Sequence, residues 1–415
     1  MPKQIKIKRY RRMYRRYHSP SSLLIKGAGI LLAVCVLAFI GWSAYGPIMD
    51  FLSGEPLSKP NEPAASSAAA AAPPVKEPEP EPELVPAMPA QIQAVYAPVS
   101  ALSSLEALDV FLDKITFTGV NALLFDLKDS NGNILYRSGL ERVSQTGAQV
   151  SGAYDLAAVC SHLVSKNIAP IGRMQAFRDP VAASALTGAG VTYMNSEMLW
   201  LDNARESGGK PWLNPYSDTA RAYLYEIAEE AVSMGVKRVL LDNVNFPVAF
   251  GGLELATYGE KAATESRPAA LASFVQEMSA RLTPRGADVS VYLSGISALG
   301  LNDVYYGGSP FDVSGDNLTI GAMPAQFGDS FILDNFSVSA PILAPGETVR
   351  SLMQALSQNL SGKQVTALIQ GYTSTASLTN NKAYLAEDIT AQISALTASG
   401  IPNYVVYSPD GNYPG

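Results

Sequence analysis

Cysteine and histidine are scarce in this chain, which has two of each among its 415 residues. Cys35 lies inside a long apolar run, so the remainder has only Cys160 and can form neither an intramolecular disulfide nor a cysteine zinc site. His162 is the one histidine outside the basic N-terminal tail, and it falls within a helical pattern that indicates a structural role. These shortages exclude a Ser–His–acid hydrolase and a histidine metal centre. We therefore expect no metal and no cofactor.

Nucleotide-binding loops are also missing, because no G-x-G-x-x-G or Walker sequence follows the first predicted strand. Acidic residues are absent from residues 1–26, which carry nine basic side chains. The whole chain has a formal net charge of −7, so removing this tail leaves −16 for the rest. An acidic body binds nucleic acid poorly, and we expect no nucleic-acid partner.

A stretch without charge, residues 27–45, follows the basic tail and is long enough to cross a bilayer. We predict a transmembrane signal-anchor helix at residues 27–47. The basic cluster on its amino side predicts a cytoplasmic tail at residues 1–26 and an extracytoplasmic position for everything after the helix. The protein is then a single-pass protein of the cell membrane, although a cleaved signal peptide would explain the same run.

Residues 48–89 are rich in proline, alanine and glutamate, including the alternation Glu77-Pro78-Glu79-Pro80-Glu81. Such a composition cannot bury a core, and its Pro-Glu run favours an extended conformation. We interpret the segment as a passive linker between the membrane helix and a folded domain at residues 90–415.

The folded domain alternates helical and strand patterns. Glycine or asparagine repeatedly ends a helical pattern just before an apolar run, which is the usual connection from helix to strand. Eight strands in such an order predict a (β/α)₈ TIM-like barrel, with a doubly wound open sheet as the alternative. The chain stops eight residues after Tyr407. Either the barrel lacks its last helix, or the segment ahead of the first strand covers the gap. The predicted strands are 92–97, 120–127, 168–175, 236–242, 289–293, 318–323, 365–370 and 404–407.

Two of these strands, the second and the fourth, end in an acid, Asp126 and Asp242. Carboxyl ends of barrel strands form the mouth where ligands bind, and inward side chains of alternate strands belong to the same layer. Glycoside hydrolysis commonly uses two carboxyl groups. Asp126 and Asp242 are therefore the candidate catalytic pair, unless Asp126 forms a structural ion pair with Lys128.

Other polar and aromatic residues follow the strands or lie in the loop before the helix at Thr219. Aromatic rings stack on sugar faces, and planar polar groups bind sugar hydroxyls. The pattern thus favours a glycan or a cell-envelope polymer as partner, although Trp212 and Tyr216 could simply pack their loop. The candidate substrate-binding residues are Lys128, Arg173, Gln175, Trp212, Asn214, Tyr216, Asn243, Asn245, Tyr292, Gln326, Gln370, Tyr372 and Tyr407.

Several ordered motifs in residues 90–413 resemble the putative glycoside hydrolase domain family of bacterial extracellular proteins, a (β/α)₈ family. The resemblance implies that fold and an activity on glycans. The motifs are Asn121–Asp129 with Gly132; Arg173, Phe177, Asp179 and Pro180; Trp212–Tyr216; and Asp242, Val244, Phe246 and Pro247, with Met323 and Gln370 in weaker blocks.

The chain also departs from the family pattern. Asn243-Val244-Asn245 lacks the arginine expected beside the strand-four acid, Tyr292 stands where strand five is expected to carry an acid, and Gly371 replaces another acid. Two hypotheses follow. Either the domain cleaves a glycan, with Asp242 as nucleophile or base and Asp126 as acid, or it is a degenerate barrel that only binds. The sequence assigns neither the glycan nor an oligomeric state.

Overall fold

The computed structural model describes residues 88–115, 119–249 and 251–414. Eight parallel strands form a closed barrel, because β1 pairs with β14 on one side and with β2 on the other. The order around the barrel is β1, β2, β5, β7, β9, β10, β13, β14. All eight predicted strands are confirmed. Their bounds are β1 Gln93–Tyr96, β2 Ala122–Lys128, β5 Ala169–Gln175, β7 Arg238–Asp242, β9 Asp288–Ser294, β10 Asn317–Gly321, β13 Gln364–Gln370 and β14 Asn403–Tyr407.

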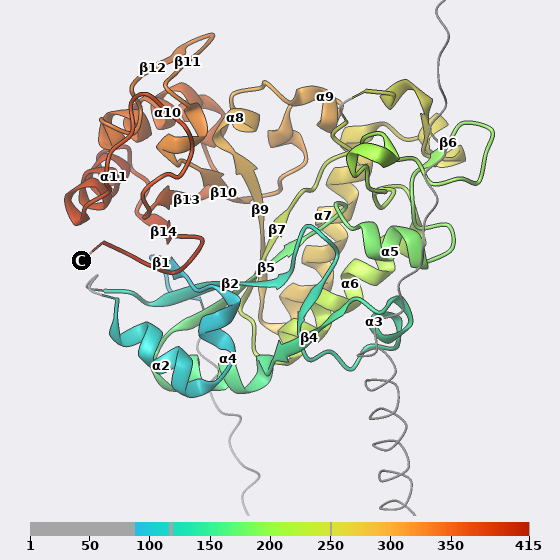
Figure 1. The fold of residues 1–415 in the computed structure, drawn as a ribbon, viewed down its shortest axis with the longest axis horizontal. Coiled ribbons are helices and arrows are strands. Elements are labelled where there is room, and N and C mark those ends of the chain that lie inside the picture. The colour runs from blue at the N-terminus through green and yellow to red at the C-terminus, as the bar shows by residue number, and fades with distance from the viewer. Residues whose placement is uncertain (1–87, 116–118, 250, 415) are drawn as a thin grey trace, which may run out of the picture. The chain divides into compact units, whose positions relative to one another are not determined.

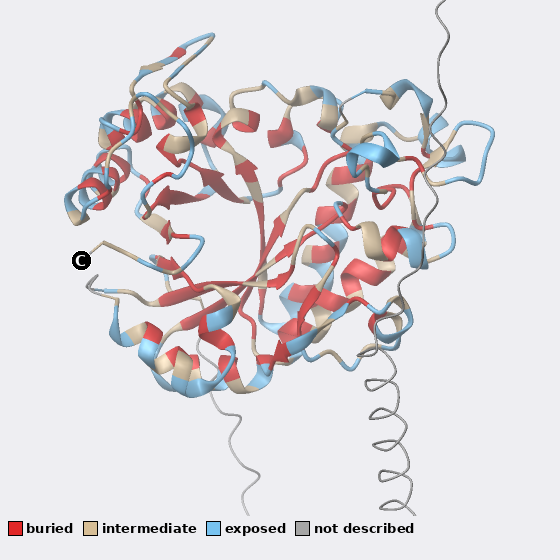
Figure 2. Cartoon of the chain, in the orientation of Figure 1, coloured by how far each residue is buried: buried red, intermediate tan, exposed pale blue. Residues whose placement is uncertain are grey.

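Strand side chains alternate between two hydrophobic cores. Ala122 and Leu124 of β2 point into the barrel, whereas Leu123 and Phe125 belong to the larger core between the strands and the helices. Figure 2 shows that the barrel strands are buried over most of their length. Burial on both faces explains why the strands read as continuous apolar runs in the sequence.

Helices surround the strands, as Figure 1 shows. The side chains of Ser104, Ser217 and Ser266 cap three of them by accepting a backbone N–H hydrogen bond in the first turn. Gly235 and Gly400 follow helices at positive φ, as the sequence pattern predicted. The principal helices are α2 Leu105–Asp113, α4 Leu156–Ser165, α6 Asp218–Ser233, α7 Arg267–Leu282, α10 Pro345–Leu360 and α11 Ala386–Ala398.

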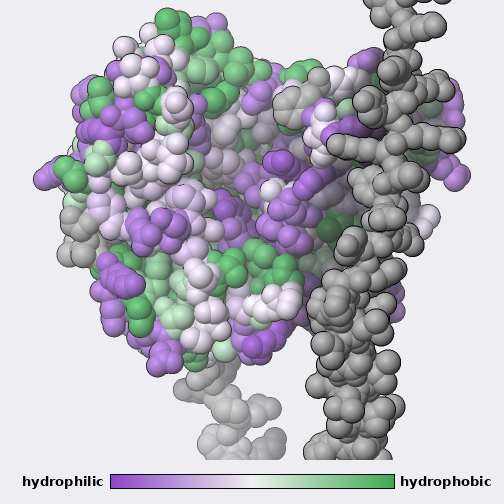
Figure 3. Space-filling model, viewed as in Figure 1, coloured by the Kyte–Doolittle hydropathy of each residue, from purple (hydrophilic) through white to green (hydrophobic). Residues whose placement is uncertain are grey.

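The structure also contains short elements that were not predicted from the sequence. None of them is longer than six residues, whereas helical periodicity is recognised over windows of about 11–18 residues. The hairpin β11–β12 carries Ile332, which is 77% exposed, and Figure 3 shows hydrophobic residues gathered over that end of the molecule. These elements are β3 Ile134–Tyr136, α3 Glu141–Thr146, β4 Gln149–Tyr154, α5 Pro180–Ala185, β6 Thr192–Tyr193, β8 Ala256–Thr257, α8 Gly295–Ala298, α9 Asp303–Tyr306, β11 Ser330–Leu333 and β12 Phe336–Ser339.

The predicted tail, the membrane helix at 27–47 and nearly all of the predicted linker lie outside the described residues. Among the residues that are described, no helix has the length and apolar character needed to cross a bilayer. No helix follows β14 in the described chain, which continues to Pro414.

Candidate active site at the carboxyl ends of the strands

Asp242 ends β7 beside a glutamine of the neighbouring strand. The strand register pairs Gln175 with Asp242, and the Gln175 Nε2 donates to Asp242 Oδ2 at 3.0 Å. The backbone N–H of Asn243 donates to Oδ1 at 2.7 Å. Asn243 has a φ of 52°, a left-handed conformation that asparagine tolerates better than most residues. This turn holds the Asp242 carboxyl at the strand end.

Burial raises the pKa of Asp242 above its usual value. The guanidinium of Arg173 and the hydrogen bonds from Gln175 and Asn243 oppose this effect, and the Asp126 carboxylate adds to it. Desolvation disfavours the charged form of a carboxyl, so the geometry makes Asp242 a group that holds a proton more readily than an exposed aspartate.

Asp126 has very different partners. Arg173 donates to both of its carboxylate oxygens, from Nε at 2.5 Å and from Nη2 at 3.0 Å. The hydroxyl of Tyr96 donates to Oδ2 at 2.8 Å. The Asp126 and Arg173 side chains are only 14% and 15% exposed. A bidentate pair of this kind fixes both groups in position and occupies both carboxylate oxygens.

Strand pairing places the two acids in one layer of the barrel. Asp126 pairs with Arg173 on β5, whereas Asp242 pairs with Gln175, two residues further along the same strand. Because barrel strands are tilted and staggered, residues at one depth advance by about one position from each strand to the next. Asp126 and Asp242, on alternate strands, therefore lie at a similar depth, and both carboxylates raise the pKa of Arg173.

Tyrosine rings surround the Arg173 guanidinium. Its carbon lies 5.3 Å from the ring centre of Tyr96 and 5.5 Å from that of Tyr407, and these two rings are 4.7 Å apart. Tyr372 approaches Tyr407 at 6.3 Å. The predicted residues Arg173, Tyr372 and Tyr407 are thus gathered on one side of the mouth, together with Tyr96. Tyr96, which ends β1 as Asp242 ends β7, was not among the predicted residues.

The interpretation of Asp126 and Lys128 as an ion pair is wrong. The register between β2 and β5 shifts between these two residues, so Lys128 is level with Met174 of the outer core. A β-bulge adds one residue and turns the following side chain to the other face. Lys128 is fully buried outside the barrel, 2.9 Å from Asp179, and its Nζ donates to the Gln175 carbonyl oxygen at 2.7 Å. The predicted binding residue Lys128 consequently does not face the mouth.

Asp242 lines a cavity of about 250 Å³. Three predicted residues, Asn243, Asn245 and Tyr292, line it as well. The remaining lining residues were missed by the sequence analysis, because most of them belong to the long connection after β9, where no periodic pattern singles them out. They are Val248, Ser294, Ser297, Asn302, Tyr305 and Tyr306.

Tyr292 and the two downstream glutamines have specific partners. Gln326 Nε2 donates to the Tyr292 hydroxyl at 3.3 Å. Gln370 is fully buried; its Oε1 accepts from the Ala325 backbone at 2.8 Å and its Nε2 donates to the Tyr372 carbonyl at 2.9 Å. Gln370 therefore shapes the loops that carry Gln326 and Tyr372.

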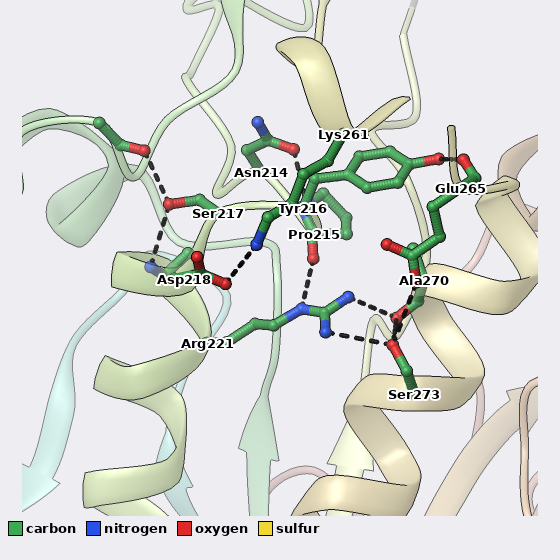
Figure 4. Close-up of polar contacts among 12 residues, drawn as sticks. Asn214, Pro215, Tyr216, Ser217, Asp218, Arg221, Lys261, Glu265, Ala270 and Ser273 are labelled. Atoms are coloured by element: carbon green, nitrogen blue, oxygen red, sulfur yellow. Dashed lines mark hydrogen bonds and ion pairs between the residues drawn. The ribbon is translucent and has the colours of Figure 1, made fainter. Parts of the chain in front are cut away.

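Trp212, Asn214 and Tyr216 are buried in their loop and do not line the Asp242 cavity. Asn214 donates to the Tyr258 carbonyl at 3.0 Å, and the Tyr216 hydroxyl donates to the Glu265 carbonyl at 2.9 Å. Figure 4 shows this loop tied to α6 and α7 through Arg221. The contacts support the packing role that the sequence analysis had left open for this loop.

A larger cavity, about 660 Å³, opens at the other end of the barrel. It is lined by Arg238 and Asp288, at the starts of β7 and β9, and these residues form a bidentate ion pair. In barrels of this type the amino-terminal end serves stability, so we place the candidate site at the opposite mouth. No cluster of acidic, cysteine or histidine side chains in the described chain is suited to bind a metal ion.

The fold and the polar strand ends define a (β/α)₈ barrel with its site at the carboxyl mouth. The chain belongs to a family described as a putative glycosyl hydrolase domain, whose model matches residues 94–413. The resemblance stated from the sequence motifs is confirmed.

A solved structure agrees on the fold. The glycoside hydrolase domain of PgaB (BpsB) from Bordetella bronchiseptica is 13% identical and matches with a TM-score of 0.53 over 77% of this chain and 95% of that one. A hypothetical protein from Ruminiclostridium thermocellum ATCC 27405 is 28% identical, with a TM-score of 0.41, over 48% of this chain and 96% of that one. A search of the curated proteins found no match.

Proposed function

We propose that this domain is an extracytoplasmic glycoside hydrolase, held at the cell membrane by residues 27–47, and that Asp242 is its proton donor. The observation that carries the proposal is the position of Asp242 in a cavity lined by amides, hydroxyls and tyrosine rings. Membership of a glycosyl hydrolase family supports the substrate class.

The environments of the two acids favour Asp242 as the general acid, a role that the sequence had suggested for Asp126. A general acid has to carry a proton near the working pH, and burial raises the pKa of Asp242 in that direction. Asp126 is bound through both oxygens by Arg173 and Tyr96, so it cannot approach a leaving group without breaking those bonds. In the proposal, Asp242 protonates the glycosidic oxygen and later accepts a proton from water.

A second candidate function is glycan binding without cleavage. The specific observation in its favour is that Tyr292, instead of an acid, faces the cavity beside Asp242. A phenol cannot exchange protons readily near neutral pH, and burial raises the pKa of Tyr292 further.

One experiment separates the two functions. The chain is assayed on a glycan array for binding and with the bound glycans for release of reducing sugar, in the wild type and in Asp242→Asn. A hydrolase releases sugar, and the variant retains binding while losing release. Binding without release by the wild type establishes the second function, and the absence of binding contradicts both.

The membrane anchor is tested separately. The apolar run and the basic tail that precedes it support a cytoplasmic N-terminus. A protease added to intact cells, or to spheroplasts where an outer layer protects the domain, is expected to remove residues 90–415 and to leave the tail protected. Protection of the domain in spheroplasts would contradict the proposed orientation.

A further inference from the structure

The cavity beside Asp242 holds a single carboxyl group among the described residues that line it. The common routes for glycoside hydrolysis need two carboxyl groups, roughly 5–9.5 Å apart on either side of the scissile bond. Asp126 does not line the cavity, and its oxygens are bound by Arg173 and Tyr96. If Asp242 protonates the leaving group, the nucleophile or base on the opposite side has to come from elsewhere.

The neighbouring strand supplies a neutral hydrogen-bond donor at this level. Leu241 of β7 is level with Val291 of β9, which places the next residues, Asp242 and Tyr292, side by side. Gln326 donates to the phenol oxygen, and no described residue accepts the phenol proton. Burial, with a contribution from Asp242, raises the pKa of Tyr292, so the hydroxyl keeps its proton at physiological pH.

A glycine makes room for this tyrosine. Gly321 of β10 lies beside the ring, and a Cβ at that position would collide with the Tyr292 hydroxyl. The phenol is therefore held between β9 and β10, with its proton available to an acceptor in the cavity. A carbonyl oxygen that develops charge during a reaction is the kind of acceptor such a donor stabilises.

Resting on the proposed function, the geometry points to a glycan with a 2-acylamino sugar at the cleaved bond, whose acyl carbonyl oxygen acts as the nucleophile that the chain lacks. Tyr292 would orient that acyl group. The cavity, about 250 Å³, is slightly below the roughly 300–1,000 Å³ common for small-molecule sites and suits one substituted sugar ring.

The bond changes balance with Asp242 alone. The bond from the anomeric carbon to the glycosidic oxygen breaks, its electron pair stays on the leaving oxygen, and that oxygen takes the Asp242 proton. The acyl carbonyl oxygen bonds to the anomeric carbon and forms a cyclic oxazolinium ion. Water then attacks the same carbon, the Asp242 carboxylate takes a proton from it, and the ring opens to restore the acylamino group.

The first test uses substrates that differ only at carbon 2. Purified protein is assayed on 4-methylumbelliferyl β-glycosides of glucose and galactose and on their N-acetyl and N-trifluoroacetyl 2-amino counterparts, and on the N-acetylglucosamine hexamer against cellohexaose. Fluorine weakens the carbonyl nucleophile, so kcat/KM should fall at least about tenfold from acetyl to trifluoroacetyl. Substrates with a 2-hydroxyl should remain uncleaved.

The second test uses variants and binding. Tyr292→Phe should lower kcat/KM for the N-acetyl substrate about 10²-fold, as loss of a transition-state donor does, and should weaken binding of the thiazoline analogue of the cyclic intermediate. Tyr404→Phe is the matched control, because Tyr404 is the second residue of β14 and lies towards the other end of the barrel. It should change neither measurement.

The outcomes separate this inference from the proposed function. Cleavage of 2-hydroxy glycosides, or a rate that ignores fluorination, overturns the inference and leaves a hydrolase that finds its second group elsewhere. If no glycoside is cleaved, both this inference and the proposed function are overturned, even if a glycan binds. An unchanged rate and unchanged thiazoline affinity in Tyr292→Phe would remove Tyr292 from the site.

Discussion

Asp126 and Asp242 are the same residue type at the same kind of position, yet the two sides of the barrel mouth treat them in opposite ways. Arg173 and Tyr96 donate three hydrogen bonds to Asp126, so both oxygens of this carboxylate already have partners. Gln175 and Asn243 hold Asp242 through neutral donors, and burial raises the pKa of this carboxyl. The partners of a strand-end acid, more than its position, decide whether it supports the fold or exchanges protons.

The largest expected effect concerns Asp242, whose proposed proton exchange distinguishes it from Asp126. Asp242→Asn keeps the shape of the side chain and removes its proton exchange, so release of reducing sugar should fall by about 10³-fold while glycan affinity changes little. Rates and affinities of both proteins are measured on the glycan that the array identifies. Asp218→Asn, on the exposed start of α6, is the control. Full activity of Asp242→Asn would reject the assignment of the proton donor.

The second prediction concerns the stability contributed by the buried ion pair between Lys128 and Asp179, which lies outside the barrel. Lys128→Met leaves the Asp179 carboxylate buried without its cation, which should lower the free energy of unfolding by about 4 kcal/mol. The double variant Lys128→Met with Asp179→Asn removes both charges and keeps the cap on α5, so it should recover most of the loss. Urea denaturation compares the three proteins. If the double variant is as unstable as the single one, the ion pair is not the cause.

Asp126→Asn tests the ion pair between Asp126 and Arg173 at the barrel mouth. The change removes the charge that faces the Arg173 guanidinium, and the free energy of unfolding should fall by about 2 kcal/mol, because the pair is partly exposed. Combining it with Arg173→Gln should cost less than the sum of the two single changes. Additive losses in urea denaturation would show that the two side chains do not act as a pair.

The smallest effect concerns pH. The raised pKa of Asp242 means that the folded protein binds this proton more tightly than the unfolded chain does. The stability that the group contributes is present below its unfolded pKa and is lost as pH rises through the folded pKa. Asp242→Asn should therefore raise Tm by about 2 °C at pH 7, and the gain should vanish at acidic pH. Thermal melts from pH 4 to 8 measure this difference, and a gain that grows at low pH would contradict the assignment.

Local signals carried most of the fold prediction. Each strand is a continuous apolar run, and Gly235 and Gly400 mark the ends of helices that precede two of them, so strand bounds were correct to within about two residues. The elements that were missed have at most six residues each, whereas helical periodicity is recognised over windows of about 11–18 residues. Of the predicted site, Asp242, Asn243, Asn245 and Tyr292 meet in one cavity, whereas Trp212 and Tyr216 are packed into a loop.

The order of strands and helices, the placement of acids at strand ends and the family all follow from the amino-acid sequence by itself, because they depend on neighbours along the chain. Only the tertiary structure decided that Lys128 faces Asp179 outside the barrel, that Arg173 binds Asp126, and that Asp242 is left with neutral partners. The physical reason is register: one additional residue in β2 reverses the direction of the side chains that follow it, and the pairing of strands far apart in sequence determines which charges meet.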